Sequence, residues 1–153
     1  MPRSSPDLPT HDLQLAGASD FDIELFHDGA CPLCSREVAW LRRRDRRRRI
    51  RFVDIADAGF DADAVGVPWQ TLLARIHGRL PDGTLIEGVE VFRRAYAAVG
   101  FGPLVALTKL PGLSHALEGG YRWFARHRLG WTGRCQDGAC RVPPRQTAPG
   151  ARP

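Results

Sequence analysis

Alternation of apolar and polar residues near the start of the chain predicts a β-α-β unit. Over residues 21–26 the two kinds of side chain alternate with a period of two, which is typical of a strand. Residues 50–55 form a second short run with β-branched side chains and predict another strand. Between them, residues 35–48 place Val38 and Leu41 at helical spacing. A helix therefore connects the first two strands.

The next segments predict a hairpin and a further helix. Residues 72–80 alternate again and predict a third strand, which ends at the turn sequence Pro81-Asp82-Gly83. Residues 84–86 then return as its partner strand. A helix follows from Gly88 and stops at Gly100. The element order β-α-β-(α)-β-β-α predicts an α/β protein with a thioredoxin-like three-layer fold.

Two stretches of the chain have weaker or purely helical patterns. Residues 57–68 contain two glycines and a proline and hold at most a short helix over 61–65. Pro68 is predicted to be an ordinary loop proline, because few X–Pro bonds are cis. Residues 103–110 predict a short apolar helix, and a longer helix follows. Both helices are expected to pack on the core. One face of that longer helix carries Leu113, Leu117, Tyr121, Phe124 and Arg128.

These patterns divide the chain into one folded domain and two tails. A chain of 153 residues fits a single domain. The predicted division is a flexible arm at 1–20, a thioredoxin-like core at 21–101, a C-terminal helical extension at 102–130, and a Cys-containing loop with a disordered tail at 131–153.

Charge and hydropathy change this picture little. The net charge of +5 comes almost wholly from arginine, with a dense run at 42–49. No aromatic residue interleaves this run for base stacking, so it is interpreted as a solvated helix end and no nucleic-acid partner is predicted. The first twenty residues lack an apolar signal region, and no run is long enough to span a membrane. We therefore expect a cytoplasmic protein without a membrane partner.

The chemistry is expected at the junction of the first strand and helix, in the stretch Asp28-Gly29-Ala30-Cys31-Pro32-Leu33-Cys34. Two thiols with two residues between them at such a junction are a redox arrangement. Cys31 is expected to cap the helix, where unpaired backbone N–H groups and the positive helix end favour a thiolate. Pro32 suits the first helical position. This pattern points to thiol–disulfide exchange.

Other interpretations of the cysteines stay open. Cys31 and Cys34 also suit half of a zinc site, which Cys135 and Cys140 would complete, or they are inert buried thiols. Cys135 and Cys140 flank a turn sequence, so they also suit a second redox pair, which we favour over zinc, or plain surface thiols. Asp28 either shapes the turn with local hydrogen bonds or relays a proton during exchange.

Several segments resemble a known family. Asp28, Cys31 and Cys34 match the signature of the DCC (Asp-Cys-Cys) family of predicted thiol-disulfide oxidoreductases. The likeness spans roughly residues 21–128 and includes 36–45, 51–56, 80–83, Gly88 with Phe92, and 121–125. The resemblance implies a thioredoxin-like fold and a dithiol active site, and it implies no particular partner.

The sequence therefore predicts an enzyme in which Cys31 attacks a substrate disulfide and Cys34 resolves the mixed disulfide, with Asp28 beside them. No cofactor is required for this chemistry. The expected partners are a disulfide-containing protein or small molecule and a thiol reductant.

Overall fold

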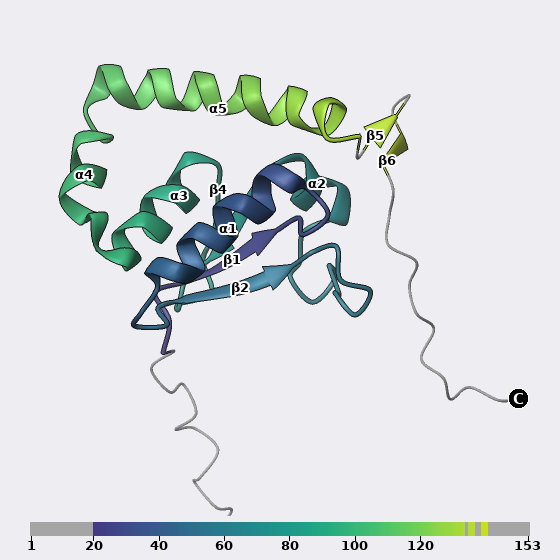
Figure 1. Cartoon of the computed structure of the whole chain (residues 1–153), viewed down its shortest axis with the longest axis horizontal. Helices are drawn as coiled ribbons and strands as arrows, with labels where there is room; N and C mark the ends of the chain where they lie inside the picture. Colours follow the sequence, from purple (N-terminus) through teal and green to yellow (C-terminus); the bar gives the residue numbers. More distant parts are fainter. Residues whose placement is uncertain (1–19, 134, 137–138, 141–153) are drawn as a thin grey trace, which may run out of the picture.

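The structure is a computed structural model that describes residues 20–133, 135–136 and 139–140. The predicted N-terminal arm, except for its last residue, and most of the predicted tail lie outside this part of the chain. Figure 1 shows one body of strands and helices with the long helix α5 running above α1 and α3.

The predicted β-α-β unit is present. Strand β1 spans Ile23–His27, helix α1 spans Pro32–Arg44, and strand β2 spans Ile50–Asp54 and pairs with β1 in parallel. All five residues of β1 are buried, including Glu24, because Arg51 and Arg79 on the two neighbouring strands pair with its carboxylate. A charged residue is thus accommodated in the central strand by ion pairs on both sides.

The predicted hairpin completes the sheet. Strands β3 (His77–Arg79) and β4 (Leu85–Glu87) are antiparallel, and β3 also pairs with β1 in antiparallel register. The strand order is β2-β1-β3-β4. Gly83 in the turn has φ +87°, a conformation that favours glycine.

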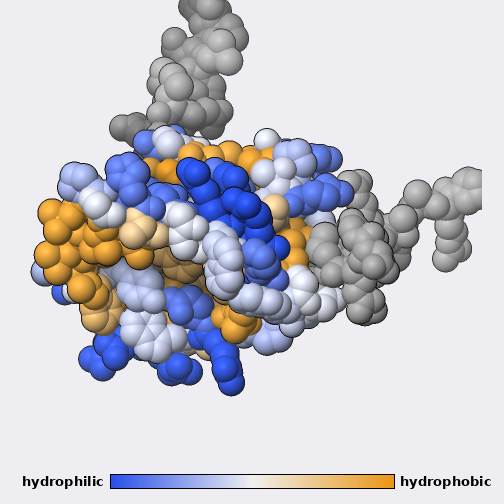
Figure 2. All heavy atoms as spheres, turned by 90° about the horizontal axis from the view of Figure 1, so that it is seen from above, coloured by the Kyte–Doolittle hydropathy of each residue, from blue (hydrophilic) through white to orange (hydrophobic). Residues whose placement is uncertain are grey.

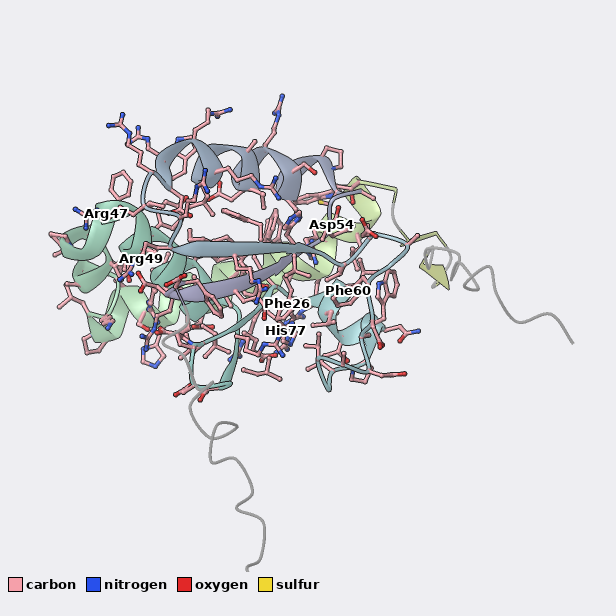
Figure 3. All side chains as sticks on the ribbon, turned by 90° about the horizontal axis from the view of Figure 1, so that it is seen from below. Phe26, Arg47, Arg49, Asp54, Phe60 and His77 are labelled. Atoms are coloured by element: carbon pink, nitrogen blue, oxygen red, sulfur yellow. The ribbon has the colours of Figure 1, made fainter. Side chains whose placement is uncertain are left out.

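Helices cover both faces of this sheet. On one face, α1 and α3 (Val89–Tyr96) bury a cluster with the sheet that includes Leu25 and Leu41. On the other face, Phe26 packs with α2 (Trp69–Ala74) and the loop before it. Figure 3 shows α1 above the strands, with Phe60 on the opposite side of the sheet. The predicted α/β, thioredoxin-like three-layer fold with a C-terminal helical extension is confirmed.

The prediction of a strand over 72–80 is wrong in its first part. Residues up to Ala74 belong to helix α2, and only His77–Arg79 form strand. The neighbours Leu72 and Leu73 are both buried against one cluster, which suits a helix and not a strand of alternating sides. The indole of Trp69 fixes the helix by donating to the carbonyl of Ile55 at 2.9 Å.

The loop before α2 also differs from expectation. No helix forms over 61–65, where the described backbone makes turns. Aspartate side chains stabilise those turns locally: Asp57 accepts from the N–H of Gly59, and Asp61 accepts from that of Asp63. The peptide bond before Pro68 is trans, as predicted.

Helix α1 ends four residues earlier than predicted. The carboxylate of Asp45 accepts the backbone N–H groups of Arg49 at 2.8 Å and Ile50 at 2.9 Å, which turns the chain into β2. Arg48 adopts a positive φ of 52° in this turn. Arg46 and Arg47 are exposed, in agreement with a solvated helix end.

The extension begins after the kink at Gly100, whose φ is +99°. A π-helical turn (Ala97–Phe101) leads into α4 (Gly102–Leu107), and α5 spans Pro111–Trp131. No residue of α4 is buried, so it packs less closely on the core than predicted. Figure 2 shows hydrophobic residues gathered at the end of the molecule that holds α4; the exposed ones are Leu104, Leu107, Leu110 and Leu113.

Among the described residues no single helix has the length and apolarity of a membrane span. Two consecutive helical segments, Val89–Leu107 and Pro111–Trp131, reach that length and apolarity only when taken together, and they are bent by 118° relative to each other.

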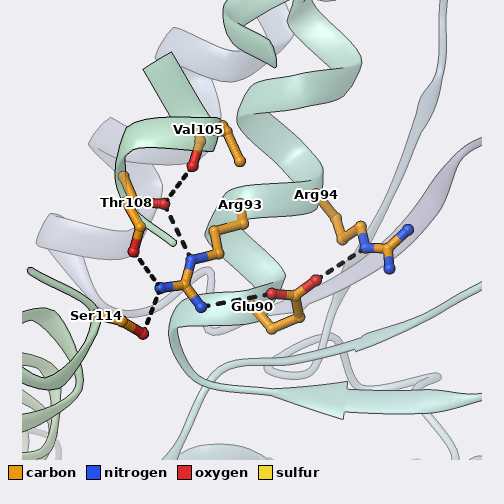
Figure 4. Close-up of polar contacts among 6 residues, drawn as sticks. All are labelled: Glu90, Arg93, Arg94, Val105, Thr108 and Ser114. Carbon is orange, nitrogen blue, oxygen red and sulfur yellow. Dashed lines mark hydrogen bonds and ion pairs between the residues drawn. The ribbon is translucent and has the colours of Figure 1, made fainter. Parts of the chain in front are cut away.

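One buried arginine fixes the extension to the core (Figure 4). Arg93 of α3 donates to the hydroxyl of Thr108 at 3.0 Å, to its carbonyl at 2.7 Å, and to the hydroxyl of Ser114 at 3.0 Å. Glu90 lies 3.6 Å from the same guanidinium. This network ties the end of α4 and the first turn of α5 to α3, so it sets where α5 crosses the sheet.

The chain then doubles back after α5, as its turn sequence indicated. Strands β5 (Cys135–Gln136) and β6 (Ala139–Cys140) pair so that Cys135 and Cys140 are opposite each other. Their side chains lie outside the described part, so the predicted roles of these two cysteines stay predictions.

Candidate active site

The turn after β1 is held by the end of β2. The carboxylate of Asp54 accepts the N–H of Gly29 and that of Ala56, both at 2.8 Å. Asp54 lies at the end of the strand in Figure 3, below the start of α1. A Cβ added to Gly29 would lie 1.9 Å from an oxygen of this carboxylate, so the close approach requires glycine.

Cys31 caps α1 as predicted. Its backbone is extended (φ −92°, ψ 117°), its carbonyl accepts the N–H of Ser35 at 2.9 Å, and Pro32 is the first helical residue. The hydroxyl of Ser35 donates to the carbonyl of Gly29 at 2.8 Å, which joins the helix to the turn. Both Cys31 and Cys34 are free thiols, and the first is fully buried while the second is partly exposed.

The two thiols have very different acidities. The pKa of Cys31 is lowered to about 5, first by a hydrogen bond from the Cys34 thiol and then by backbone N–H groups of Leu33 and Cys34, although burial opposes this. The pKa of Cys34 is raised, because it donates that hydrogen bond and because it is buried. The pair therefore holds one negative charge at neutral pH, centred on Cys31, with the remaining proton on Cys34.

A third residue joins the pair from the far end of the chain. The guanidinium of Arg128 in α5 donates to Sγ of Cys34 at 3.0 Å and also to the carbonyl of Leu73. Arg128 is only 5% exposed. The sequence indicated only that it lies on the packing face of a helix; a charged residue on an apolar face was the one available signal.

Asp28 lies where the prediction placed it, at the end of β1, and is 2% exposed. Its carboxylate accepts the N–H of Ala30 at 3.2 Å, which supports the turn-shaping role. Its negative charge also raises the pKa of Cys34, so it is close to the second thiol. The proton relay stays a prediction.

A cavity of about 210 Å³ lies beside the thiol pair. Its walls come from β1, α1, α2, α3 and α5, and they include Cys34 and Arg128. His27 also lines it: this side chain is 7% exposed, and neither ring nitrogen has a hydrogen-bond partner within the described residues. Burial lowers the pKa of His27, which favours the neutral ring.

The zinc hypothesis has no further support from the described residues, which contain no group of three His, Cys, Asp or Glu side chains that could hold a metal. The side chains of Cys135 and Cys140, which that site requires, lie outside the described part. The four-cysteine site stays a hypothesis.

Comparisons with known proteins agree with this site. Residues 25–134 match the family described as DCC1-like thiol-disulfide oxidoreductase. A protein from Arabidopsis thaliana, printed as "Uncharacterized protein At5g50100, chloroplastic", is 37% identical over 117 residues, which cover 75% of this chain and 55% of the relative. The chain thus spans about half the length of that relative. No solved structure matches the chain. The matched residues include the whole dithiol turn and Arg128, and the chain belongs to the DCC1-like thiol-disulfide oxidoreductase family.

Proposed function

We propose that the protein is a thiol-disulfide oxidoreductase in which Cys31 attacks and Cys34 resolves. The observation that carries this proposal is the placement of two free thiols at the start of α1, with Cys31 at the helix cap and Cys34 accepting a hydrogen bond from Arg128 at 3.0 Å. The lowered pKa of Cys31, about 5, agrees with it. A thiolate at neutral pH is the attacking species in disulfide exchange. Membership of the family supports redox chemistry of this kind in general.

The reaction proceeds in two exchanges. The Cys31 thiolate attacks one sulfur of the substrate disulfide, forms a mixed disulfide, and releases the first substrate thiolate. Cys34 then loses its proton, and its thiolate attacks Sγ of Cys31 and releases the second substrate thiolate. The protein dithiol is oxidised to a disulfide and the substrate is reduced to two thiols. A thiol reductant returns the protein to the dithiol form.

Access and acidity favour different sulfurs of the pair. Cys31 has the lower pKa but is fully buried, whereas Cys34 is partly exposed. The residues around Cys31 in the turn, Ala30 and Pro32, are themselves exposed. Attack by Cys31 therefore requires a small displacement of this turn, and its lower pKa favours it as the attacking thiol.

Arg128 acts in the second exchange. Once Cys31 is bonded to substrate, it no longer accepts a hydrogen bond from Cys34 or repels its charge. Burial and Asp28 still raise the pKa of Cys34, and Arg128 lowers it. A buried guanidinium 3.0 Å from Sγ thus stabilises the thiolate that must form for resolution. Arg128 is in this proposal a catalytic residue.

The remaining sequence predictions on partners and location extend this proposal. The substrate is a disulfide in a protein or a small molecule, the electron donor is a thiol, and nucleic acid and membrane are not partners. The cytoplasmic location stays a prediction.

The pH dependence of the first exchange tests the proposal. The rate of attack on excess 2-hydroxyethyl disulfide, followed in stopped flow, should rise as pH increases through about 5, because the pKa of Cys31 is lowered to that value. The rate should be nearly constant around neutral pH and fall below pH 5, where the thiol is protonated. A midpoint near the ordinary thiol pKa of ~8.5 would show that no activated thiolate exists.

A further inference from the structure

The helical extension encloses the surface next to the dithiol. Helix α5 crosses the end of the sheet where β1 ends and β3 begins, and the hydroxyl of Tyr121 accepts the N–H of Ile76 at 2.8 Å. This N–H, at the entry to β3, is therefore not available to the backbone of another chain. On the same helix, Arg128 bonds to Cys34 and to the carbonyl of Leu73. Helix α5 thus occupies the backbone N–H at the entry to β3 and one side of Cys34.

What remains beside Cys34 is the cavity of about 210 Å³. This volume is below the roughly 300–1,000 Å³ of sites for drug-sized ligands. A disulfide within a folded protein continues into main chain on both sides of each cysteine, and such a segment does not fit a cavity of this size. A compact molecule fits. The partly exposed Cys34 and the exposed Leu33 in its wall connect the cavity to solvent.

The cavity lining favours a ligand that is mostly apolar. Apolar side chains from five elements and from the loop before β3 line the cavity, among them Leu33, Ile76, Phe92 and Phe124. The carboxylate of Glu37 also lines it and accepts a hydrogen bond from the hydroxyl of Tyr96 at 2.5 Å. Asp28 and Arg128 line it too, and the Arg128 guanidinium is already bonded to Cys34 and to the carbonyl of Leu73. Two carboxylates beside one cation that already has partners disfavour an anionic ligand. The walls therefore suit an uncharged molecule.

His27 supplies the polar contact. Its side chain lines the cavity, and a buried imidazole without a partner is costly unless a bound group satisfies it. The neutral ring has one donor and one acceptor. An amide or hydroxyl on the ligand complements such a ring.

We propose that the substrate is a low-molecular-weight disulfide with an apolar, uncharged body, which enters the cavity beside Cys34 and not the surface used by a protein disulfide. This inference rests on the proposed exchange chemistry and names its substrate class. The bond changes are those of the two exchanges above: the bound disulfide takes two electrons from the dithiol and leaves as two thiols. Cys31 attacks first, as in the proposed function: it caps α1 one turn before Cys34, which lies in the cavity wall.

The test compares three disulfides as substrates of the full chain: lipoamide (apolar and uncharged), cystine (zwitterionic) and insulin (a protein). We expect kcat/KM for lipoamide to exceed the other two by at least roughly tenfold, since burial of an apolar group of this size is worth at least ~1.4 kcal/mol. Turnover of insulin as efficient as that of lipoamide would overturn the inference while leaving the exchange chemistry intact. Failure of all three to oxidise the reduced protein would instead refute the proposed function, and the inference with it.

Substitutions in the cavity wall test whether the preference for lipoamide comes from binding in the cavity. Phe124→Ala and Leu33→Ala should each raise KM for lipoamide several-fold and leave KM for cystine unchanged. Leu33 is 40% exposed, so its replacement does not endanger folding. The matched control is Trp123→Ala on the outer side of α5, where the indole is 57% exposed, and it should change neither value. If Phe124→Ala and Leu33→Ala raised KM equally for lipoamide and for cystine, that result would contradict binding of the substrate in the cavity.

Discussion

Replacing Arg128 with methionine should make the mixed disulfide accumulate. The variant removes the guanidinium that donates to Sγ of Cys34 at 3.0 Å and replaces it with an uncharged side chain that fills much of the same space. A hydrogen bond to a charged group is worth ~1.5–3 kcal/mol, so resolution should slow roughly 10- to 100-fold. The first exchange should slow much less, because Arg128 is the smallest of the causes that lower the pKa of Cys31. Rapid acid quench and intact-mass measurement would show the adduct.

Two controls separate this role from a structural one. Arg122→Met replaces an exposed arginine of the same helix and should leave both steps unchanged. Arg128 also bonds to the carbonyl of Leu73, so Arg128→Met should lower stability as well, and thermal unfolding would measure that loss. Arg128→Lys retains the charge and should recover part of the resolution rate. Equal slowing of both exchanges in Arg128→Met would leave Arg128 only a packing role.

Replacing Gly29 with alanine should destabilise the protein and displace the dithiol turn. The new Cβ would lie 1.9 Å from a carboxylate oxygen of Asp54, and that carboxylate is held by two backbone N–H groups. Moving it breaks the links between the turn and the end of β2. Overpacking of this kind costs about 1–3 kcal/mol of unfolding free energy, which chemical denaturation would measure. The first exchange should slow as well, because the turn positions Cys31.

Gly119→Ala is the matched control for this substitution. Gly119 lies in α5 with no atom within 4 Å of an added Cβ, so alanine should stabilise the helix by up to about 1 kcal/mol. If Gly29→Ala had the same unfolding free energy and the same exchange rate as the wild type, the turn would not depend on this close approach.

Local patterns predicted the sheet and the dithiol turn well, because each depends on short-range order. The alternation over 21–26, the turn at 81–83, and proline after Cys31 each specify backbone geometry without distant partners. The strand predicted over 72–80 was wrong at its start because tertiary burial of Leu72 and Leu73 on one cluster outweighed a short alternating pattern. Likewise, Asp45 ends α1 through hydrogen bonds to residues beyond the helix, which no periodicity reveals.

The part of the active site that the sequence did not predict depends on contacts between residues far apart in the sequence. Arg128 lies 94 residues from Cys34, and its helical spacing indicated only a packing face. The cavity likewise forms where five elements meet, and His27 is notable only because its ring has no hydrogen-bond partner among the described residues. Such features depend on how α5 crosses the sheet, which the Arg93 network sets through contacts between three helices.

The central claim is that Cys31 and Cys34 exchange with a disulfide in that order, and intact-mass measurement of two trapped variants tests it most directly. Reduced Cys34→Ser should retain one half of 2-hydroxyethyl disulfide, bonded to Cys31, while reduced Cys31→Ser should form little adduct. All three proteins carry serine at positions 135 and 140, so that Cys31 and Cys34 are the thiols followed. The protein that keeps both Cys31 and Cys34 should lose two hydrogens and retain no substrate. A stable adduct on Cys34 in the Cys31→Ser variant, formed as fast as the first exchange in the wild type, would reverse the order. A wild type that stays reduced in excess disulfide would contradict the account.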